Sequence, residues 1–150
     1  MWRAETLWQF SCDYYAPRQR AFLALQDHYQ LNINLLLLAI FLDRQNLALT
    51  TAQWQQLIAH IADSDAELQS MRQHRRNLSR GSEEYQQSLT TELQLEKQQQ
   101  AACIVWLNQQ SEAIPAGAGN LARYAKVQVP NIDKLQLDAL EVDGSLADGR

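Results

Sequence analysis

The sequence has few of the residues that make turns, cross-links and metal sites. Its 150 residues include five glycines, three prolines and two cysteines. Cys12 and Cys103 are far apart and fit neither a CxxC pair nor a zinc-binding spacing. Two reduced thiols in a cytoplasmic protein are therefore expected. The scarcity of glycine and proline, against 20 glutamines and many leucines, favours helices joined by short turns.

Basic side chains are outnumbered, and no apolar run is long enough to cross a membrane. The chain has 13 lysines and arginines against 17 acidic residues, a net charge of −4. This balance disfavours binding to nucleic acid or to an anionic membrane surface. The longest apolar run, residues 35–42, has eight residues, whereas a membrane-spanning helix needs about 20. The opening, MWRAETLWQF, has no signal-peptide pattern, so a cytoplasmic location is expected.

The same apolar run predicts the centre of the fold. A helix over about 33–44 would be apolar on every face, so other helices must surround it. The sequence predicts these neighbouring helices at 4–15, after Pro17, within TTAQWQQLIAHIA, from about 64 to the turn RGS, from 83 to about 110, and in LARYAKV and PNIDKLQLDALEV. The expected fold is all-α: a single-domain helical bundle around the buried central helix, with a long helical hairpin at about 64–110. Residues 1–125 would form this helical domain, and 126–150 a short C-terminal helix with DGSLADGR as a flexible tail.

Polar residues at the expected helix starts predict where those helices begin. A side-chain oxygen at the N-cap accepts a hydrogen bond from a backbone N–H group of the first turn. The predicted caps are Asn32, the capping boxes Thr50/Gln53 and Ser64/Glu67, Ser82 for the long helix, and Asn120 for LARYAKV. The polar run KQQQ at 97–100 is interpreted as a solvated helix face.

Three stretches, LWQFSCDYY, LALQDHYQLNINLLLL and TELQLEK, together resemble a family of small uncharacterised proteobacterial proteins, a domain of unknown function. The resemblance covers roughly 7–125. The matching positions are Trp8, Phe10, Ser11 and Tyr15; Leu25, Gln26 and Asp27; Ile33 and Asn34; Arg72, Arg75 and Arg76; and Glu92, Leu93 and Glu96. The family tends to have glycine just before its asparagine-containing element, where this chain has Gln30, so the turn there must tolerate a side chain. The resemblance implies no activity.

The first candidate site lies around the turn that precedes the central helix and consists of Gln26, Asp27, Asn32 and Asn34. Gln26 shares a helix face with Phe22, Leu25 and Tyr29, so its amide is expected to be buried and to need partners. In the favoured interpretation, Gln26 and Asn34 bond the backbone of neighbouring helix ends. In the alternative, their amides line a small polar pocket.

Arginines and glutamates on the predicted hairpin form the second candidate site. Arg72, Arg76 and Arg80 recur every four residues and so form one stripe, while Arg75 turns toward the apolar face. Glu92 and Glu96 share a face of the next helix. Antiparallel packing would bring Arg72 close to Glu92, so Arg72 and Arg75 are expected to pair with the glutamates. Arg76 and Arg80 are expected to point to solvent, with Glu83 and Glu84 as the nearest acids.

No catalytic residue, metal site or cofactor is predicted. The sequence contains no Glu-x-x-His pair of the kind that di-metal bundles use, and no recognisable nucleophile–base set or phosphate loop. The favoured hypothesis is a non-enzymatic cytoplasmic domain that presents its arginine-rich helix or a groove to another protein. An acidic surface on that protein would suit the arginines. The alternative is a helical domain that binds a small anionic ligand, or acts on one, in a polar pocket near Gln26, Asn34 and Arg75. The oligomeric state stays open.

Overall fold

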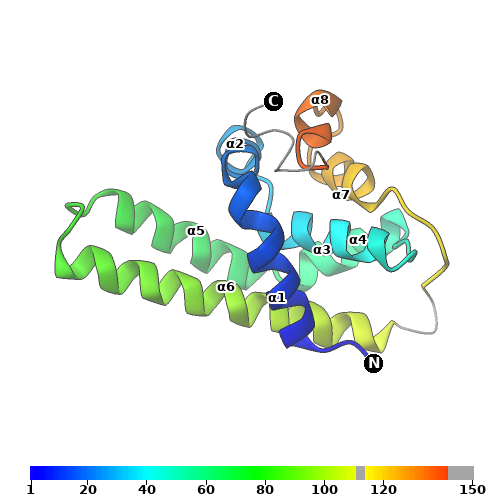
Figure 1. Cartoon of the computed structure of the whole chain (residues 1–150), viewed down its shortest axis with the longest axis horizontal. Helices are drawn as coiled ribbons and strands as arrows, with labels where there is room; N and C mark the ends of the chain where they lie inside the picture. Colours follow the sequence, from blue (N-terminus) through cyan, green and yellow to red (C-terminus); the bar gives the residue numbers. More distant parts are fainter. Residues whose placement is uncertain (111–113, 142–150) are drawn as a thin grey trace.

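The computed structural model describes residues 1–110 and 114–141, and helices dominate these ranges (Figure 1). The elements are α1 (Ala4–Tyr15), the 3-10 turn η1 (Ala16–Arg18), α2 (Gln19–Tyr29), α3 (Ile33–Arg44), α4 (Thr51–His60), α5 (Ala62–Arg76), α6 (Glu83–Gln109), α7 (Asn120–Gln128) and α8 (Lys134–Asp138). The only β-type pairing in the described ranges is an isolated bridge between Leu47 and Ala116. The prediction of an all-α bundle is confirmed. No helix of the described chain is both long and apolar enough to span a bilayer.

The helix α3 is the centre of the bundle, as predicted. Every residue from Asn34 to Leu42 is buried. Its neighbours are α1, α2, α6 and α7, which come from both ends of the sequence and enclose it. A helix that is apolar on every face is stable in water only inside such a shell, so α3 brings the other helices together.

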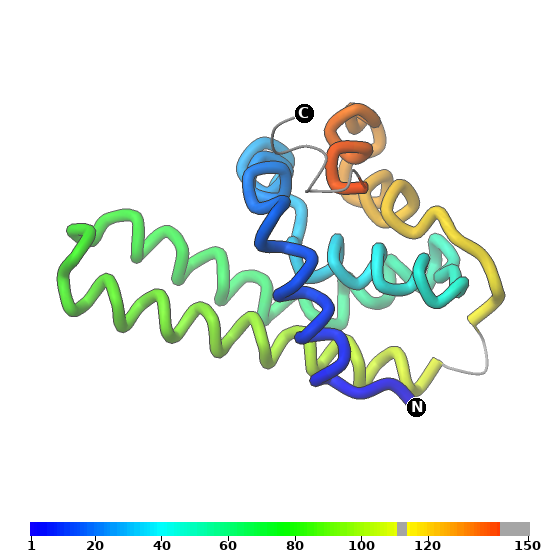
Figure 2. Tube along the Cα trace, viewed as in Figure 1, coloured from blue at the N-terminus to red at the C-terminus, as the bar shows by residue number. Residues whose placement is uncertain are grey.

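The helices α5 and α6 form the predicted antiparallel hairpin, which projects from the side of the bundle (Figures 1 and 2). Ser82 caps α6 by accepting a hydrogen bond from the Tyr85 backbone N–H. The second half of α6 enters the body of the protein, where Cys103, Ile104 and Leu107 are buried. The half of the hairpin near the turn lies outside the main core.

The caps of α3 and α4 are confirmed, and that of α5 is wrong. Asn32 accepts from the Leu35 N–H, and Thr50 and Gln53 form the reciprocal capping box. Ser64, however, lies inside α5, where its hydroxyl donates to the Ile61 carbonyl. The break between α4 and α5 falls at Ile61, so Ser64 and Glu67 cap nothing.

Asn120 has a different role from the predicted N-cap. It is the first residue of α7, after Gly119 at the N-cap position. Its side chain accepts from the Leu49 N–H and donates to Asp43 and to the Leu47 carbonyl. These bonds fasten the start of α7 to the loop after α3, so Asn120 connects elements rather than starting a helix.

Hydrogen bonds tie both ends of the described chain to the bundle. The backbone N–H and C=O of Trp2 both bond the Asn108 side chain, at 2.8 and 3.0 Å. The Tyr14 hydroxyl donates to the Leu140 carbonyl, which holds the segment after α8. The helix α8 packs on α2 and α7. The predicted tail DGSLADGR lies outside the described residues.

The turn between α2 and α3 places a side chain where glycine is usual. Gln30, the C-cap of α2, has φ 60° and ψ 31°, the left-handed conformation. Its N–H donates to the Gln26 carbonyl at 2.8 Å, which closes the helix. A Cβ atom in this conformation clashes with the following carbonyl, so the turn is strained.

We predict that Gln30→Gly stabilises the protein. Relief of left-handed strain is worth about 1–2 kcal/mol, and the entropy that glycine loses on folding takes back about 0.5–1 kcal/mol. A net gain of about 0.5–1 kcal/mol should appear in urea unfolding. Gln30→Ala is the control: it keeps the Cβ atom and should bring no gain. Equal gains in both variants would show that the glutamine side chain, and not the backbone, destabilises the turn.

Candidate functional site

A pocket of about 190 Å³ lies where α1, the start of α3, α5 and α6 meet. Its apolar wall comes from Trp8, Ile33, Leu37 and Leu93. Its polar wall comes from Ser11, Asn32, Asn34, Arg72, Glu96 and Gln100, with Cys12 and Tyr15 also in contact. We call it the α1–α6 pocket. Apolar walls with a few converging polar groups are typical of small-molecule sites.

Asn34 fixes the polar side of this pocket. Its Nδ2 donates to the Glu96 carbonyl at 3.1 Å and to Gln99 Oε1 at 2.9 Å. Because both partners are acceptors, the amide has one possible orientation, with Oδ1 turned to Gln100 Nε2 at 3.1 Å. The favoured interpretation of the sequence was that Asn34 bonds the backbone of a neighbouring helix. The bond to the Glu96 carbonyl fits this interpretation. The others make Asn34 part of a buried side-chain network.

Gln100 continues this network and leaves one atom unsatisfied. Its Nε2 donates to Asn34 and, at 2.8 Å, to Ser11 Oγ on α1. These two acceptors fix the amide, so Oε1 lies on the other side. Gln100 is 1% exposed, and its Oε1 has no hydrogen-bond partner. A buried unpaired carbonyl oxygen costs about 1–3 kcal/mol, and since this atom is closed to solvent, the cost falls on the stability of the fold.

A second branch of the network connects α3 to α5. Asn32 Nδ2 donates to Asp65 Oδ1 at 2.8 Å and to Gln99 Oε1 at 3.0 Å. Gln99 Nε2 in turn donates to Ser64 Oγ at 2.9 Å. The interpretation of KQQQ as a solvated face is therefore wrong for Gln99 and Gln100, which are both buried.

Arg72 and Glu96 are the charged residues that line the pocket. Arg72 Nη2 lies 3.9 Å from Glu96 Oε1, and the two side chains are 14% and 35% exposed. That distance is too long for a hydrogen bond. Burial raises the pKa of the Glu96 carboxyl, and the charge of Arg72 offsets this only in part. Glu96 is thus a partly buried carboxylate whose nearest cation does not bond it.

Arg72 also faces a second pocket, of about 370 Å³, between α2 and α5. Gln26 lies there, half-buried rather than buried as expected. With its amide oxygen turned toward Arg72, Gln26 accepts hydrogen bonds from the guanidinium at 3.1–3.3 Å. The predicted grouping of Gln26 with Asn34 is therefore wrong: they line different pockets, and Arg72 separates them.

Arg72 and Arg75 face Glu96 and Glu92, as expected, but which arginine faces which glutamate differs from the prediction. Arg75 Nε bonds Glu92 Oε2 at 2.5 Å, and this carboxylate is buried. The bond to Glu92 is the main cause that raises the pKa of Arg75. The expected approach of Arg72 to Glu92 is wrong: Arg75 occupies that place, and Arg72 faces Glu96 one turn further along α6. Arg75 lines neither pocket and so cannot serve in the predicted ligand site.

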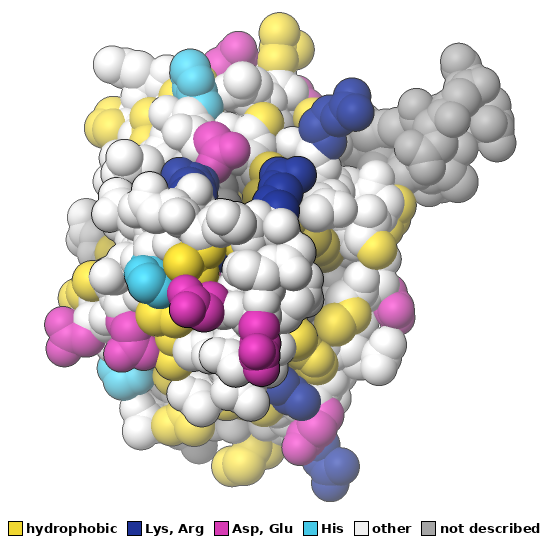
Figure 3. All heavy atoms as spheres, turned by 90° about the vertical axis from the view of Figure 1, so that its left-hand side faces the viewer, with side chains coloured by type: hydrophobic (Ala, Val, Ile, Leu, Met, Phe, Trp, Pro, Cys, Tyr) yellow, Lys and Arg dark blue, Asp and Glu magenta, His cyan; other side chains and the backbone are white. Residues whose placement is uncertain are grey.

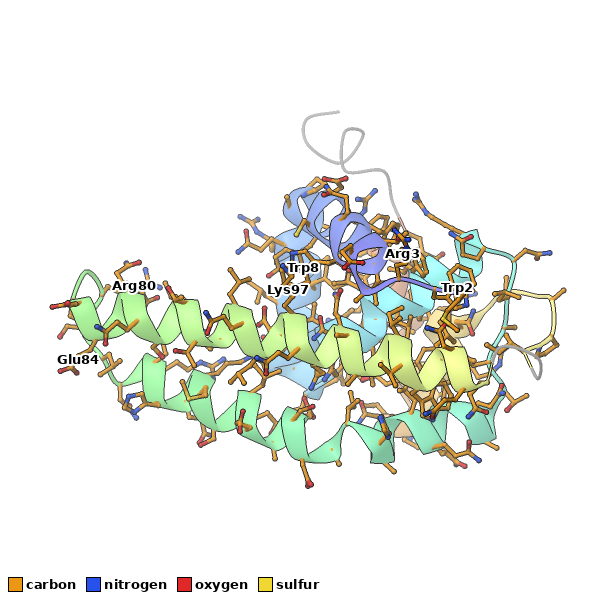
Figure 4. The ribbon with its side chains drawn as sticks, turned by 90° about the horizontal axis from the view of Figure 1, so that it is seen from below. Trp2, Arg3, Trp8, Arg80, Glu84 and Lys97 are labelled. Atoms are coloured by element: carbon orange, nitrogen blue, oxygen red, sulfur yellow. The ribbon has the colours of Figure 1, made fainter. Side chains whose placement is uncertain are left out.

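The outer arginines do not form a continuous basic patch. Arg76 is exposed as expected, yet its partner is Asp27 on α2, at 3.3 Å, and not the acids after the turn. Arg80 lies at the tip of the hairpin near Glu84 (Figure 4). The face that carries the tip shows acidic and basic side chains interspersed (Figure 3). The arginine stripe is therefore largely neutralised by nearby carboxylates.

No group of three or more His, Cys, Asp or Glu side chains converges as a metal site among the described residues.

An aromatic ring and a cation lie at the edge of the α1–α6 pocket. Lys97 Nζ lies 5.7 Å from the centre of the Trp8 ring, between α1 and α6 (Figure 4). This distance is within the range of a cation–π contact.

We predict that removing the Asn34 amide destabilises the fold more than removing that of Gln26. Asn34→Ala removes three hydrogen bonds that join α3 to α6 and should cost about 2–3 kcal/mol. Gln26→Ala removes a half-buried contact that water can replace and should cost about 1 kcal/mol or less. Urea unfolding of both variants measures the difference. Equal losses would mean that the Asn34 network contributes no more than a surface contact.

Comparison with curated proteins and with solved structures finds no match for this chain. A family model described as "Protein of unknown function (DUF2390)" matches residues 6–103. This span includes every residue that lines the α1–α6 pocket. The resemblance to an uncharacterised family is thus confirmed at the level of the family, and the chain belongs to the DUF2390 family.

Proposed function

We propose that this protein binds a small molecule in the α1–α6 pocket. One observation carries the proposal: buried polar side chains from α1, α3 and α6 converge on the pocket in orientations that their own hydrogen bonds fix. Groups held in this way lose little conformational freedom when a ligand binds.

The size of the pocket limits the ligand. An engineered cavity of about 150 Å³ accommodates benzene, and the α1–α6 pocket measures about 190 Å³. We therefore propose a ligand whose apolar part is one ring or two fused rings. Trp8 and Leu93 would flank it, while Ile33 and Leu37 would form the inner wall.

Indole is a suitable probe for the proposal, and Cys12 provides a way to block the site. Titration of the ¹⁵N-labelled full chain with indole should give saturable shifts at the amides of Ser11, Asn34 and Gln100. Alkylation of the exposed Cys12 with N-phenylmaleimide should abolish these shifts, because Cys12 lines the pocket. Cys103 should not react in the folded protein, since burial raises its pKa to about 12.

Cys12→Ser is the matched control for this experiment. The variant should bind indole like the unmodified protein and should keep doing so after treatment with the maleimide. Indole shifts that survive alkylation of the native chain, or that scatter over residues outside the pocket, would contradict a ligand site here.

We also propose a cytoplasmic location, which two unpaired cysteines support. The hypothesis of a protein partner at the arginine stripe has weaker support. Arg72 and Arg75 face glutamates, and Arg76 pairs with Asp27. Arg80 alone in the stripe has no ion pair within the described ranges. Docking of an acidic partner would therefore compete with carboxylates already present.

We predict that charge reversal of the outer stripe has little effect on folding. The Arg76–Asp27 pair has side chains 59% and 60% exposed, and such pairs contribute about 0–1 kcal/mol. Arg76→Glu combined with Arg80→Glu should therefore change the free energy of unfolding by less than about 1 kcal/mol. Arg75→Glu is the contrast: it would set two carboxylates together and should destabilise strongly. A large loss in the double variant would show that the stripe stabilises the hairpin.

A further inference from the structure

The amides that line the α1–α6 pocket have no hydrogen left to donate to a ligand. Asn34 uses both ends of its amide, and Gln100 uses both hydrogens of its Nε2. The guanidinium nitrogens of Arg72 lie against the Gln26 amide. Gln100 Oε1 has no partner, but it is closed to solvent. A ligand that fills this pocket therefore finds no free amide hydrogen in its wall, and the Glu96 carboxylate is the acceptor that it can reach.

Glu96 places a negative charge in this wall of the pocket. Its carboxylate receives no hydrogen bond from the described residues, and the closest cation, Arg72, is 3.9 Å away. The side chain is partly exposed, so a ligand can reach it. Desolvation of the carboxylate is the largest cause of the raised pKa of Glu96. A cation with N–H donors would therefore restore the interactions that Glu96 loses on leaving water.

The aromatic wall suits the same kind of group. Trp8 lines the pocket, and the Lys97 ammonium already lies over its ring at 5.7 Å. Tyr15 lines the pocket as well, close enough to Glu96 that the charge of Glu96 contributes to raising the pKa of Tyr15, after burial. Aromatic faces attract ammonium groups and repel carboxylates. The carboxylate of Glu96 and the aromatic rings thus favour the same ligand class.

We infer that the ligand of the α1–α6 pocket is a small amine: an apolar ring with a protonated amino group, which Glu96 binds. This inference rests on the proposed ligand site and specifies it. It also replaces the anionic ligand that the arginines suggested, because Arg72 turns to Gln26, while Glu96 would repel an anion.

Three probes of similar shape test the charge of the ligand. The full chain is titrated at pH 7 with 2-phenylethylamine, 2-phenylethanol and 3-phenylpropanoate, and binding is followed by shifts of the pocket amides. A charge-assisted hydrogen bond is stronger than a neutral one by an amount that corresponds to about tenfold in Kd. The amine should bind about tenfold more tightly than the alcohol, and the carboxylate more weakly than both.

Substitution of Glu96 tests whether its carboxylate binds the amino group of the ligand. Glu96→Gln keeps the shape of the side chain and should reduce amine binding to the level of the alcohol, leaving the affinity for the alcohol unchanged. Glu84→Gln, at the far tip of the hairpin (Figure 4), is the matched control and should keep the preference for the amine. The comparison of probes on the native chain stands even if the Glu96 variant folds poorly.

The outcomes separate this inference from the proposed function. Equal affinity for the three probes, preference for the carboxylate, or a preference for the amine that survives in Glu96→Gln would overturn the inference, while ligand binding in the pocket would stand. Absence of saturable binding by all three probes would contradict the pocket as a ligand site. A preference for the amine that Glu96→Gln removes is the result we expect.

Discussion

Desolvation of the polar groups at the start of α3 is the constraint on which the rest of the structure depends. Because α3 is apolar on every face, it is buried along its length, and its first turn carries Asn32 and Asn34 into the interior. Each buried amide must find partners or destabilise the fold. Gln99 and Gln100 of α6 provide them, and Ser11 of α1 completes the chain of bonds. The positions of α1 and α6 relative to α3 are therefore fixed by hydrogen bonds as well as by apolar packing.

A pocket lies beside the same network. Asn34 and Gln100 form part of its polar wall, and Leu37 and Leu93 form part of its apolar wall. Each amide of the network has one orientation, since the donor or acceptor of its neighbour fixes which end faces it. Its last acceptor, Gln100 Oε1, is left unpaired and closed to solvent. The residues that join the three helices thus also line the pocket.

Local patterns in the sequence predicted the elements, and contacts between distant segments decided the site. The central helix, the hairpin and the caps at Asn32, Thr50 and Ser82 each depend on neighbouring residues, so the sequence was sufficient for them. The burial of Gln99 and Gln100 depends on what packs across from them, namely α1 and α3, and a run of glutamines carries no trace of that. Asn120 was misassigned for a similar reason: a residue that suits an N-cap also suits bonds to a distant loop. The pairing of Arg75 with Glu92 depends on how far the two helices are shifted along each other. The prediction assumed a symmetric turn and placed Arg72 opposite Glu92, an error of about one helical turn.

The projecting hairpin should open on a different timescale from the core of the bundle. Near its turn, the buried residues of α6 are Ser88 and Glu92, and α5 contributes only Leu68 to the buried apolar set. Cooperative units with little buried apolar surface open with less free energy than the whole protein needs to unfold. Backbone amides near the turn should therefore exchange with solvent through local opening, while those of α3 exchange only through global unfolding. Since Arg72 and Glu96 lie between these regions, the pocket stands at the boundary between a rigid unit and one that opens independently.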